Sequence, residues 1–247
     1  MKALILAAGQ GTRLRPETDN RPKCLVDIGG STILAHQIRT CAKAGLDEAV
    51  VITGFEWQQV ETEITNITSE QDSLKVSTVY NPFFGISNNL ATLWSARHVM
   101  GDAFISINGD DILDVSILKR LRADNSQPIL VSIDQKDGYD DDDMKILLDG
   151  NRITAINKTI PLAQAQGESI GIMKFSGKGV TRLQEELETM IRTETGLSDW
   201  YTKSIERIAQ SGFPVGAFNI EGAPWAEIDF PEDLAYVRTH LQDLVHG

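Results

Sequence analysis

Two glycines and a group of positive charges lie close together near the beginning of the chain. The glycines are Gly9 and Gly11, and the cationic residues after them are Arg13, Arg15, Arg21 and Lys23. Glycines let backbone N–H groups approach phosphate oxygens closely, and Arg and Lys neutralise phosphate charge. Because the whole chain has a formal net charge of -12, a local cluster of cations indicates an anionic small ligand. The segment therefore predicts a polyphosphate-binding loop.

The element before this loop decides where the loop lies. Residues 2–7 form an apolar run, which predicts a buried strand, and ligands of open α/β sheets bind beyond the carboxyl ends of the strands. The segment lacks the third glycine of the dinucleotide fingerprint, Pro16 and Pro22 prevent an immediate long helix, and no Walker A motif occurs. A Rossmann dehydrogenase and a P-loop kinase are both disfavoured, and a plain glycine turn with surface arginines is the structural alternative.

A pair of aspartates follows another apolar run. Asp110 and Asp111 come after the predicted strand 103–107, again at a strand end. Phosphoryl chemistry needs charge neutralisation, usually by Mg²⁺ held by one or two carboxylates, so Asp110 is the predicted first magnesium ligand. Aspartate is also frequent in turns and caps, and taken alone that role would be the more common one.

Composition limits the classes of protein to consider. The chain has 247 residues, 41% of them apolar and 23% charged, which is typical of a soluble globular protein. Its acidity argues against a nucleic-acid partner, and no apolar stretch is long enough to span a membrane, so we expect a cytoplasmic protein. Cys24 and Cys41 lack the spacing of a zinc site or a disulfide framework. The oligomeric state stays open.

Hydrophobic periodicity predicts alternating strands and helices, and hence an α/β fold with parallel pairing. Beyond residue 114 the pattern changes, and Asp149-Gly150 between two short runs predicts a hairpin. Helices are predicted over 31–44, 57–68, 89–99, 115–123, 178–192, 198–210 and from about 231; strands are predicted over 2–7, 48–53, 74–79, 103–107, 129–134, 144–148, 152–157 and 169–175.

The pattern Leu6-Ala-Ala-Gly-x-Gly-Thr-Arg-Leu14, with Pro22-Lys23, closely resembles the signature of nucleotidyltransferases that make nucleoside-diphosphate-activated sugars and alcohols. The resemblance implies a single Rossmann-like, mixed but mainly parallel sheet flanked by helices (nucleotidyltransferase or GT-A-like), with a small β-rich acceptor-side extension. It implies one domain over 1–247, with a nucleotide-binding half at about 1–114 and an acceptor-binding half at about 115–247. The implied nucleotide-binding residues are Leu6, Ala7, Ala8, Gly9, Gly11, Thr12, Arg13 and Lys23; Arg13 and Lys23 are also implied to be catalytic.

The same resemblance extends to later segments. Glu227-Ile-Asp229 resembles the family's late Glu-Ile-Asp motif, which implies that Asp229 completes a Mg²⁺ site with Asp110; the alternative is a charge pair at a helix N-terminus. Lys158 resembles the catalytic lysine that contacts the acceptor's phosphoryl group. Glu168 matches the following family segment and is implied to touch the acceptor, and an exposed glutamate at a sheet edge is equally compatible with the pattern.

Residues 81–94 resemble those of bacterial choline-phosphate cytidylyltransferases and their phosphonate-activating relatives, which implies that Asn88 and Asn89 bind the acceptor. Both could equally cap a helix. A quaternary ammonium would call for an aromatic cage, and a primary amine for carboxylates such as those of residues 140–143, although such a run is usually just solvated. The candidate cage aromatics are Phe83, Phe84, Trp94, Trp200, Tyr201 and Trp225, several of which should simply be core residues.

The expected activity is Mg²⁺-dependent transfer of CMP from CTP to a small phosphate or phosphonate acceptor, similar to phosphocholine or aminoethylphosphonate, with release of pyrophosphate. The alternative is a sugar-1-phosphate nucleotidylyltransferase that uses UTP, dTTP or GTP. A non-catalytic nucleotide-binding subunit would have little need for both carboxylates and Lys158. A glycosyltransferase would more typically carry an Asp-x-Asp motif, from which Asn108-Gly-Asp110 departs.

Overall fold

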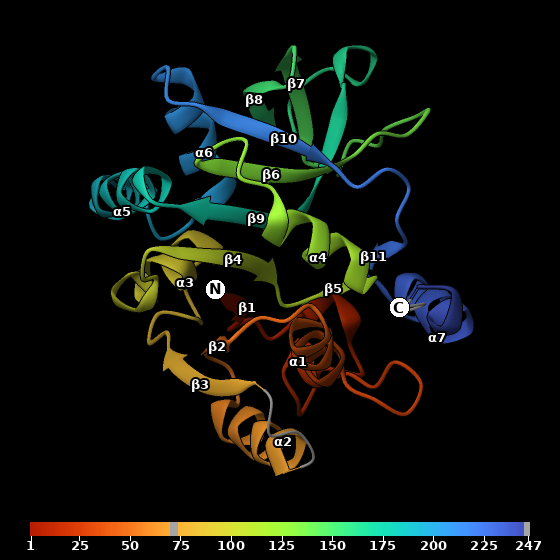
Figure 1. Ribbon diagram of the computed structural model, residues 1–247. Helices are drawn as coiled ribbons and strands as arrows, with labels where there is room; N and C mark the ends of the chain where they lie inside the picture. Colours follow the sequence, from red (N-terminus) through yellow and green to blue (C-terminus); the bar gives the residue numbers. More distant parts are fainter. Residues whose placement is uncertain (70–73, 245–247) are drawn as a thin grey trace.

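The computed structural model describes residues 1–69 and 74–244, apart from the side chain of residue 242. Their main feature is a nine-stranded sheet in the order β3-β2-β1-β4-β9-β6-β10-β8-β7, which runs from bottom to top of Figure 1. The strands are β1 (Lys2–Ala7), β2 (Glu48–Thr53), β3 (Lys75–Tyr80), β4 (Ala103–Asn108), β6 (Ile129–Asp134), β7 (Lys145–Asp149), β8 (Arg152–Asn157), β9 (Gly167–Ser176) and β10 (Val215–Asn219).

The first four strands of this order form a parallel sheet. β1 pairs in parallel with both β2 and β4, and β2 pairs in parallel with β3. Ala3, Ile5 and Ala7 point to one face of β1 while Leu4 and Leu6 point to the other, and both sets lie in hydrophobic clusters. The near-continuous apolar run of residues 2–7 arises because the strand is buried on both faces.

The remaining strands make the sheet mixed, as predicted. β9 runs antiparallel to both β4 and β6, β10 pairs in parallel with β6, and β7 and β8 form the predicted hairpin. β10 was not predicted, because a five-residue run that contains Gly216 and follows Pro214 carries little strand signal. The parallel pairing predicted from the alternating pattern therefore describes the first half of the sheet better than the second.

Helices cover both faces of the sheet. One face packs against α1 (Ile33–Lys43), α2 (Trp57–Ser69) and α4 (Val115–Ala123), and the other against α3 (Asn89–Ser95), α5 (Lys178–Met190) and α6 (Tyr201–Gln210). In Figure 1, α1 and α4 lie in front of the sheet and α7 (Pro231–Leu244) lies beside β11. The predicted helices are confirmed within a few residues, except that the one predicted to reach residue 99 ends at Ser95, before a 3-10 turn.

A two-stranded ladder lies outside the main sheet. β5 (Asp111–Leu113) pairs antiparallel with β11 (Trp225–Glu227), and Asp111 is the register partner of Glu227. The backbone N–H of Ile228 also donates to the carbonyl of Asp110 at 3.1 Å. These strands are too short to predict from periodicity, yet they bring the segment after β4 beside the segment before α7.

Two further sequence expectations concern cysteines and membranes. Cys24 and Cys41 are both buried and are free thiols. Among the described residues, none of the helices combines the length and the apolar character that crossing a bilayer requires.

Candidate active site

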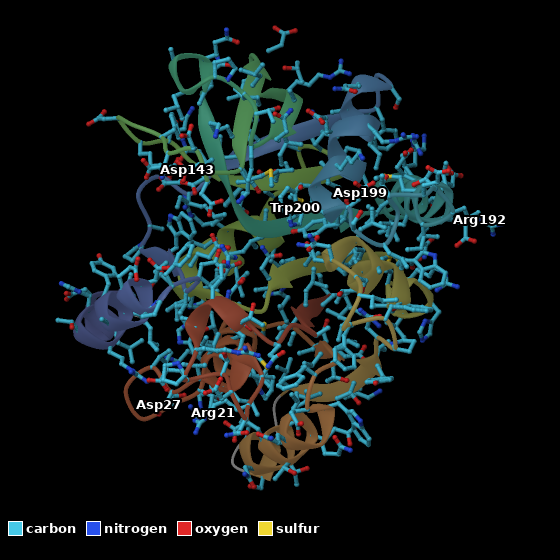
Figure 2. The ribbon with its side chains drawn as sticks, turned by 180° about the vertical axis from the view of Figure 1, so that it is seen from behind. Arg21, Asp27, Asp143, Arg192, Asp199 and Trp200 are labelled. Atoms are coloured by element: carbon cyan, nitrogen blue, oxygen red, sulfur yellow. The ribbon has the colours of Figure 1, made fainter. Side chains whose placement is uncertain are left out.

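A cleft of about 620 Å³ opens at the carboxyl ends of β1 and β4 and extends along the first half of β9 to Lys158, just after β8. All the residues implied by the resemblance line it except Thr12, which is exposed in a 3-10 turn. Of the four clustered cations, only Arg13 and Lys23 line the cleft. In Figure 2, Arg21 is labelled in the lower part of the view, whereas Trp200 is labelled near its centre.

The loop after β1 folds back so that the Lys23 side chain packs against Gly11. Gly11 has φ of 74°, and a Cβ atom on it would lie 2.7 Å from Cβ of Lys23. A side chain at residue 11 would therefore be strained and would displace the lysine. Gly9 faces open space, and Gly109 lets the loop after β4 approach β1 so closely that a Cβ there would lie 2.5 Å from the carbonyl oxygen of Leu6. Gly11 and Gly109 thus let neighbouring segments approach closely, while Gly9 borders the open cavity.

Lys23 bridges the two aspartates that were predicted to hold a metal. Its Nζ lies 2.6 Å from Oδ2 of Asp110 and 2.6 Å from Oδ1 of Asp229. Arg13 contacts the second oxygen of Asp229 at 2.7 Å and lies over the ring of Phe230. Burial alone would lower the pKa of Lys23, but the two carboxylates outweigh it and raise the pKa above its usual value. Lys23 is therefore a charged ammonium.

Three acidic side chains converge beside this bridge. Carboxylate oxygens of Asp110, Asp111 and Glu227 lie within 4.8 Å of one another. Asp111 is 1% exposed, and burial and neighbouring carboxylates raise its pKa well above the usual value. Glu227 lines the cleft, but the surrounding protein still removes much of the water around its carboxylate. This desolvation, together with the negative charges of Asp110 and Asp229, raises the pKa of Glu227 to about 8.

This acidic group fits a divalent cation. Oδ1 of Asp110 and Oδ2 of Asp111 are buried and have no hydrogen-bond partner, which is costly unless something else compensates them. Oxygen donors of carboxylates are the ligands that Mg²⁺ prefers in proteins. The strand-end position predicted Asp110 as a ligand and the resemblance implied Asp229. Asp111 was noted beside Asp110 but was not predicted as a ligand, because its place next to Glu227 depends on the ladder of β5 with β11.

The opposite wall of the cleft carries Lys158. This residue follows β8, and its Nζ lies 2.5 Å from Oδ1 of Asp142 and 5.3 Å from the centroid of the Trp200 ring. The acidic run 140–143 is thus not merely solvated, because Asp142 and Asp143 line the cleft.

Glu168 lies inside the sheet. It pairs in register with Asp134 of β6 and Lys145 of β7 and is 7% exposed, so the alternative of an exposed edge glutamate is wrong. Lys136 contacts Oε2 of Glu168 at 2.6 Å and Oδ2 of Asp143 at 3.0 Å. Burial raises the pKa of Glu168 to about 7 despite this lysine. Lys136 was not predicted, because it lies in a loop without a motif.

Asn88 and Asn89 line the cleft and also cap helices. Oδ1 of Asn88 accepts from the N–H of Asn89 at the start of α3, and Oδ1 of Asn89 accepts from the N–H of Tyr201 at the start of α6, at 2.9 Å. The capping alternative is therefore correct for Asn88, whereas Asn89 is the first residue of α3 and its oxygen is bonded to the start of another helix. The amide NH₂ group is what each side chain could offer a ligand.

The candidate cage aromatics divide into two groups. Phe84, Trp200 and Tyr201 line the cleft, whereas Phe83, Trp94 and Trp225 do not. Trp94 instead donates to Glu188 of α5 at 2.8 Å beneath Arg97. Trp200 is 45% exposed, and Tyr201 is buried with its hydroxyl against the carbonyl of Gly171. Trp200 is thus the aromatic ring most available to a ligand next to Lys158.

The chain belongs to the MobA-like NTP transferase domain family, whose model matches residues 3–206. The prediction of a nucleotidyltransferase from the loop after β1 is therefore confirmed. Among solved structures, the inositol-1-phosphate CTP transferase from T. maritima matches with a TM-score of 0.80 and 20% identity, over 100% of this chain and 98% of that one. This likeness confirms the predicted α/β nucleotidyltransferase fold.

Curated relatives differ in how much of each protein matches. The chain is 28% identical to a bifunctional IPC transferase and DIPP synthase from Rubrobacter xylanophilus, over 94% of this chain but 50% of that protein. It is 32% identical to a CMP-5'-(3-aminopropyl)phosphonate synthase from Streptomyces rubellomurinus, over 50% of this chain and 19% of that protein. A UTP–glucose-1-phosphate uridylyltransferase from Haloferax volcanii is 25% identical over 98% and 97%. The first two relatives are thus matched over half their length or less.

Proposed function

We propose that this chain catalyses Mg²⁺-dependent transfer of CMP from CTP to a small phosphate or phosphonate acceptor, with release of pyrophosphate. The observation that carries the proposal is the arrangement of charges in one cleft. Lys23 and Arg13 lie with Asp110 and Asp229 at one wall, and Lys158 lies at the other. Two anionic substrates that must meet need cations at both places.

Each residue has a role in this proposal. The backbone of residues 6–8 binds base and ribose at the end of β1, and the loop through Gly9 and Gly11 holds the triphosphate, whose charge Arg13 and Lys23 neutralise. Asp110 and Asp229 would hold Mg²⁺, with Asp111 and Glu227 beside them. When bound, the metal would neutralise phosphate oxygens during the transfer. We propose the same division of the chain as before, with residues 1–114 serving the nucleotide and 115–247 the acceptor.

The reaction needs no side-chain nucleophile. An acceptor oxygen held by Lys158 is already anionic, and it attacks the α-phosphorus in line while the bond to pyrophosphate breaks. Lys158 both orients this oxygen and offsets the repulsion between the two anions, so the residues of the cleft contribute positioning and charge compensation.

The acceptor in this proposal carries a cationic group at its far end. Asp142, Asp143 and Glu168 place carboxylates near Lys158, and Trp200 offers a ring face, which are the two ways of binding an amine or a quaternary ammonium. Phosphocholine and aminoethylphosphonate are acceptors of this kind. The name of the Streptomyces relative, an aminopropylphosphonate synthase, supports the same choice and the choice of CTP.

A sugar-1-phosphate nucleotidylyltransferase is the second candidate, because the uridylyltransferase from Haloferax matches over nearly its whole length. One assay separates the two. Pyrophosphate release is measured with each of the four NTPs against phosphocholine, aminoethylphosphonate, inositol phosphate and hexose-1-phosphates. We expect turnover with CTP and an amine-bearing acceptor. Turnover with UTP and a hexose-1-phosphate would replace the proposal with the second candidate, and no turnover with any pair would favour a binding protein.

A further inference from the structure

Lys23 occupies the place between the two carboxylates that are proposed to hold the metal. Its ammonium contacts one oxygen of Asp110 and one of Asp229, both at 2.6 Å, and Arg13 contacts the other oxygen of Asp229. Both oxygens of Asp229 are thus engaged by cations. The lysine side chain is only 12% exposed, so water does little to screen these contacts.

A divalent ion cannot use both carboxylates while this bridge stands. It would have to approach a fixed positive charge and compete for oxygens that are already bonded. Asp110 keeps one buried oxygen without a partner, next to Asp111 and Glu227. An ion at these oxygens would lack Asp229 and would lie near the ammonium of Lys23, which makes the site poor for a cation that prefers six or more ligands. We infer that the ammonium of Lys23 takes the position of the metal ion when no nucleotide is bound. It holds Asp110 and Asp229 together and excludes a divalent ion until the phosphates of a triphosphate attract the ammonium away.

The surroundings of Lys23 allow such an exchange. The first carbons of its side chain lie against Gly11, while Gly9 faces open space in the same cleft. Phosphate oxygens in the loop would therefore compete for the ammonium at the end of a flexible stem whose base is fixed. Arg13 would turn to the same phosphates and free the second oxygen of Asp229.

Metal and nucleotide should consequently bind with positive coupling. The triphosphate supplies oxygens to the metal and removes the cations that exclude it, and the metal in turn favours the nucleotide by the same factor. The inference rests on the proposed metal role of Asp110 and Asp229, but not on the choice of base or acceptor.

The test measures Mn²⁺ binding to the full chain without nucleotide, by loss of the electron paramagnetic resonance signal of free Mn²⁺. We expect weak binding by the wild type and binding at least about tenfold tighter by Lys23→Met, which removes the competing charge. Lys23→Arg keeps the charge and should stay as weak as the wild type. The double variant Lys23→Met with Asp110→Asn should lose the gain, because the new site needs that carboxylate.

Lys158→Met is the matched control. It removes the same charge from the same cleft, but Lys158 contacts Asp142 rather than Asp110 or Asp229. Its Mn²⁺ affinity should change far less than that of Lys23→Met. An equal gain in both variants would show a general effect of net charge and would overturn the inference.

Other outcomes also decide the matter. Equal Mn²⁺ affinity of the wild type and Lys23→Met would mean that Asp110, Asp111 and Glu227 bind the metal even while Lys23 is in place. The inference would then fail. Circular dichroism checks folding, and if Lys23→Met does not fold, Lys23→Gln takes its place with the same expectations. Absence of Mn²⁺ binding in every variant, even with CTP, would overturn the metal assignment as well. Pyrophosphate release by the wild type tests the proposed reaction separately.

Discussion

The two walls of the cleft are built in different ways. At the wall next to β1, the contacts depend on glycines that let backbone segments touch, and on Lys23 held between Asp110 and Asp229. At the wall next to β9 and Lys158, Asp143 and Glu168 come from separate segments, and Lys136, from a third segment, contacts both of them. The first wall is encoded by a short motif and the second is assembled by the sheet. In the proposed function, the first wall therefore serves the triphosphate and the second selects the acceptor.

The largest expected effect is at the first wall. Lys23→Ala and Asp110→Asn should each lower turnover in the pyrophosphate-release assay about 10² to 10³-fold, because each removes compensation of charge in the transition state. Arg15→Ala is the control, since Arg15 is exposed, pairs with Asp19 four residues later and does not line the cleft. Full activity in a folded Lys23→Ala protein would show that Lys23 does not contribute to turnover.

Lys158→Ala tests whether the second wall serves the acceptor alone. We expect KM for the acceptor to rise about 10 to 100-fold while KM for CTP stays unchanged, because a charge-assisted contact to one substrate is lost. Lys203→Ala, which removes a lysine paired with Asp199 outside the cleft lining, should change neither constant. An equal rise in both KM values would contradict the separation of the two walls.

Gly11→Ala should affect the first wall through the backbone. Gly11 and Gly150 both have positive φ, but a Cβ at residue 11 meets Lys23, whereas one at residue 150 meets open space. Both substitutions should lower the free energy of unfolding by about 1 kcal/mol. Only Gly11→Ala should also reduce turnover, by about tenfold, as the lysine is displaced. Steady-state kinetics measures turnover, and denaturant unfolding measures stability. An equal loss of turnover in Gly150→Ala would show that the effect of Gly11→Ala is not specific to the contact with Lys23.

Glu168→Gln addresses the second wall through stability rather than through turnover. Burial raises the pKa of Glu168 from 4.5 to about 7, so the folded state keeps a proton that the unfolded chain has released. This contribution to stability is complete below pH 4.5 and is lost as the pH rises through 7. Between pH 5.5 and 8 the wild type should therefore lose about 2 kcal/mol relative to Glu168→Gln.

The measurement is denaturant unfolding of both proteins at several pH values, compared as a difference. Glu61→Gln on the exposed surface of α2 is the control and should follow the wild type. A difference that does not change with pH would mean that Glu168 is ionised throughout the range and that Lys136 compensates it fully.

Much of the site could be predicted because its motifs follow strand ends. The apolar run 2–7 and the glycines after it indicate a strand followed by a ligand loop, and the turn at residues 149–151 indicates the hairpin of β7 and β8. Such signals are local, since they depend on alternation, glycine conformation and helix periodicity. The family resemblance added the distant residues Lys158 and Asp229, which no local rule connects to the loop.

The sequence by itself determined the elements of the first wall: the buried strand, the glycine loop, the cations Arg13 and Lys23, and the aspartate after β4. Only the tertiary structure decided that Lys23 bridges Asp110 and Asp229, that β5 and β11 bring Asp111 beside Glu227, and that Lys136 joins Asp143 to Glu168. These contacts join residues far apart in the chain or in separate loops. Their geometry follows from strand order and register, which depend on how the whole sheet packs rather than on any one segment.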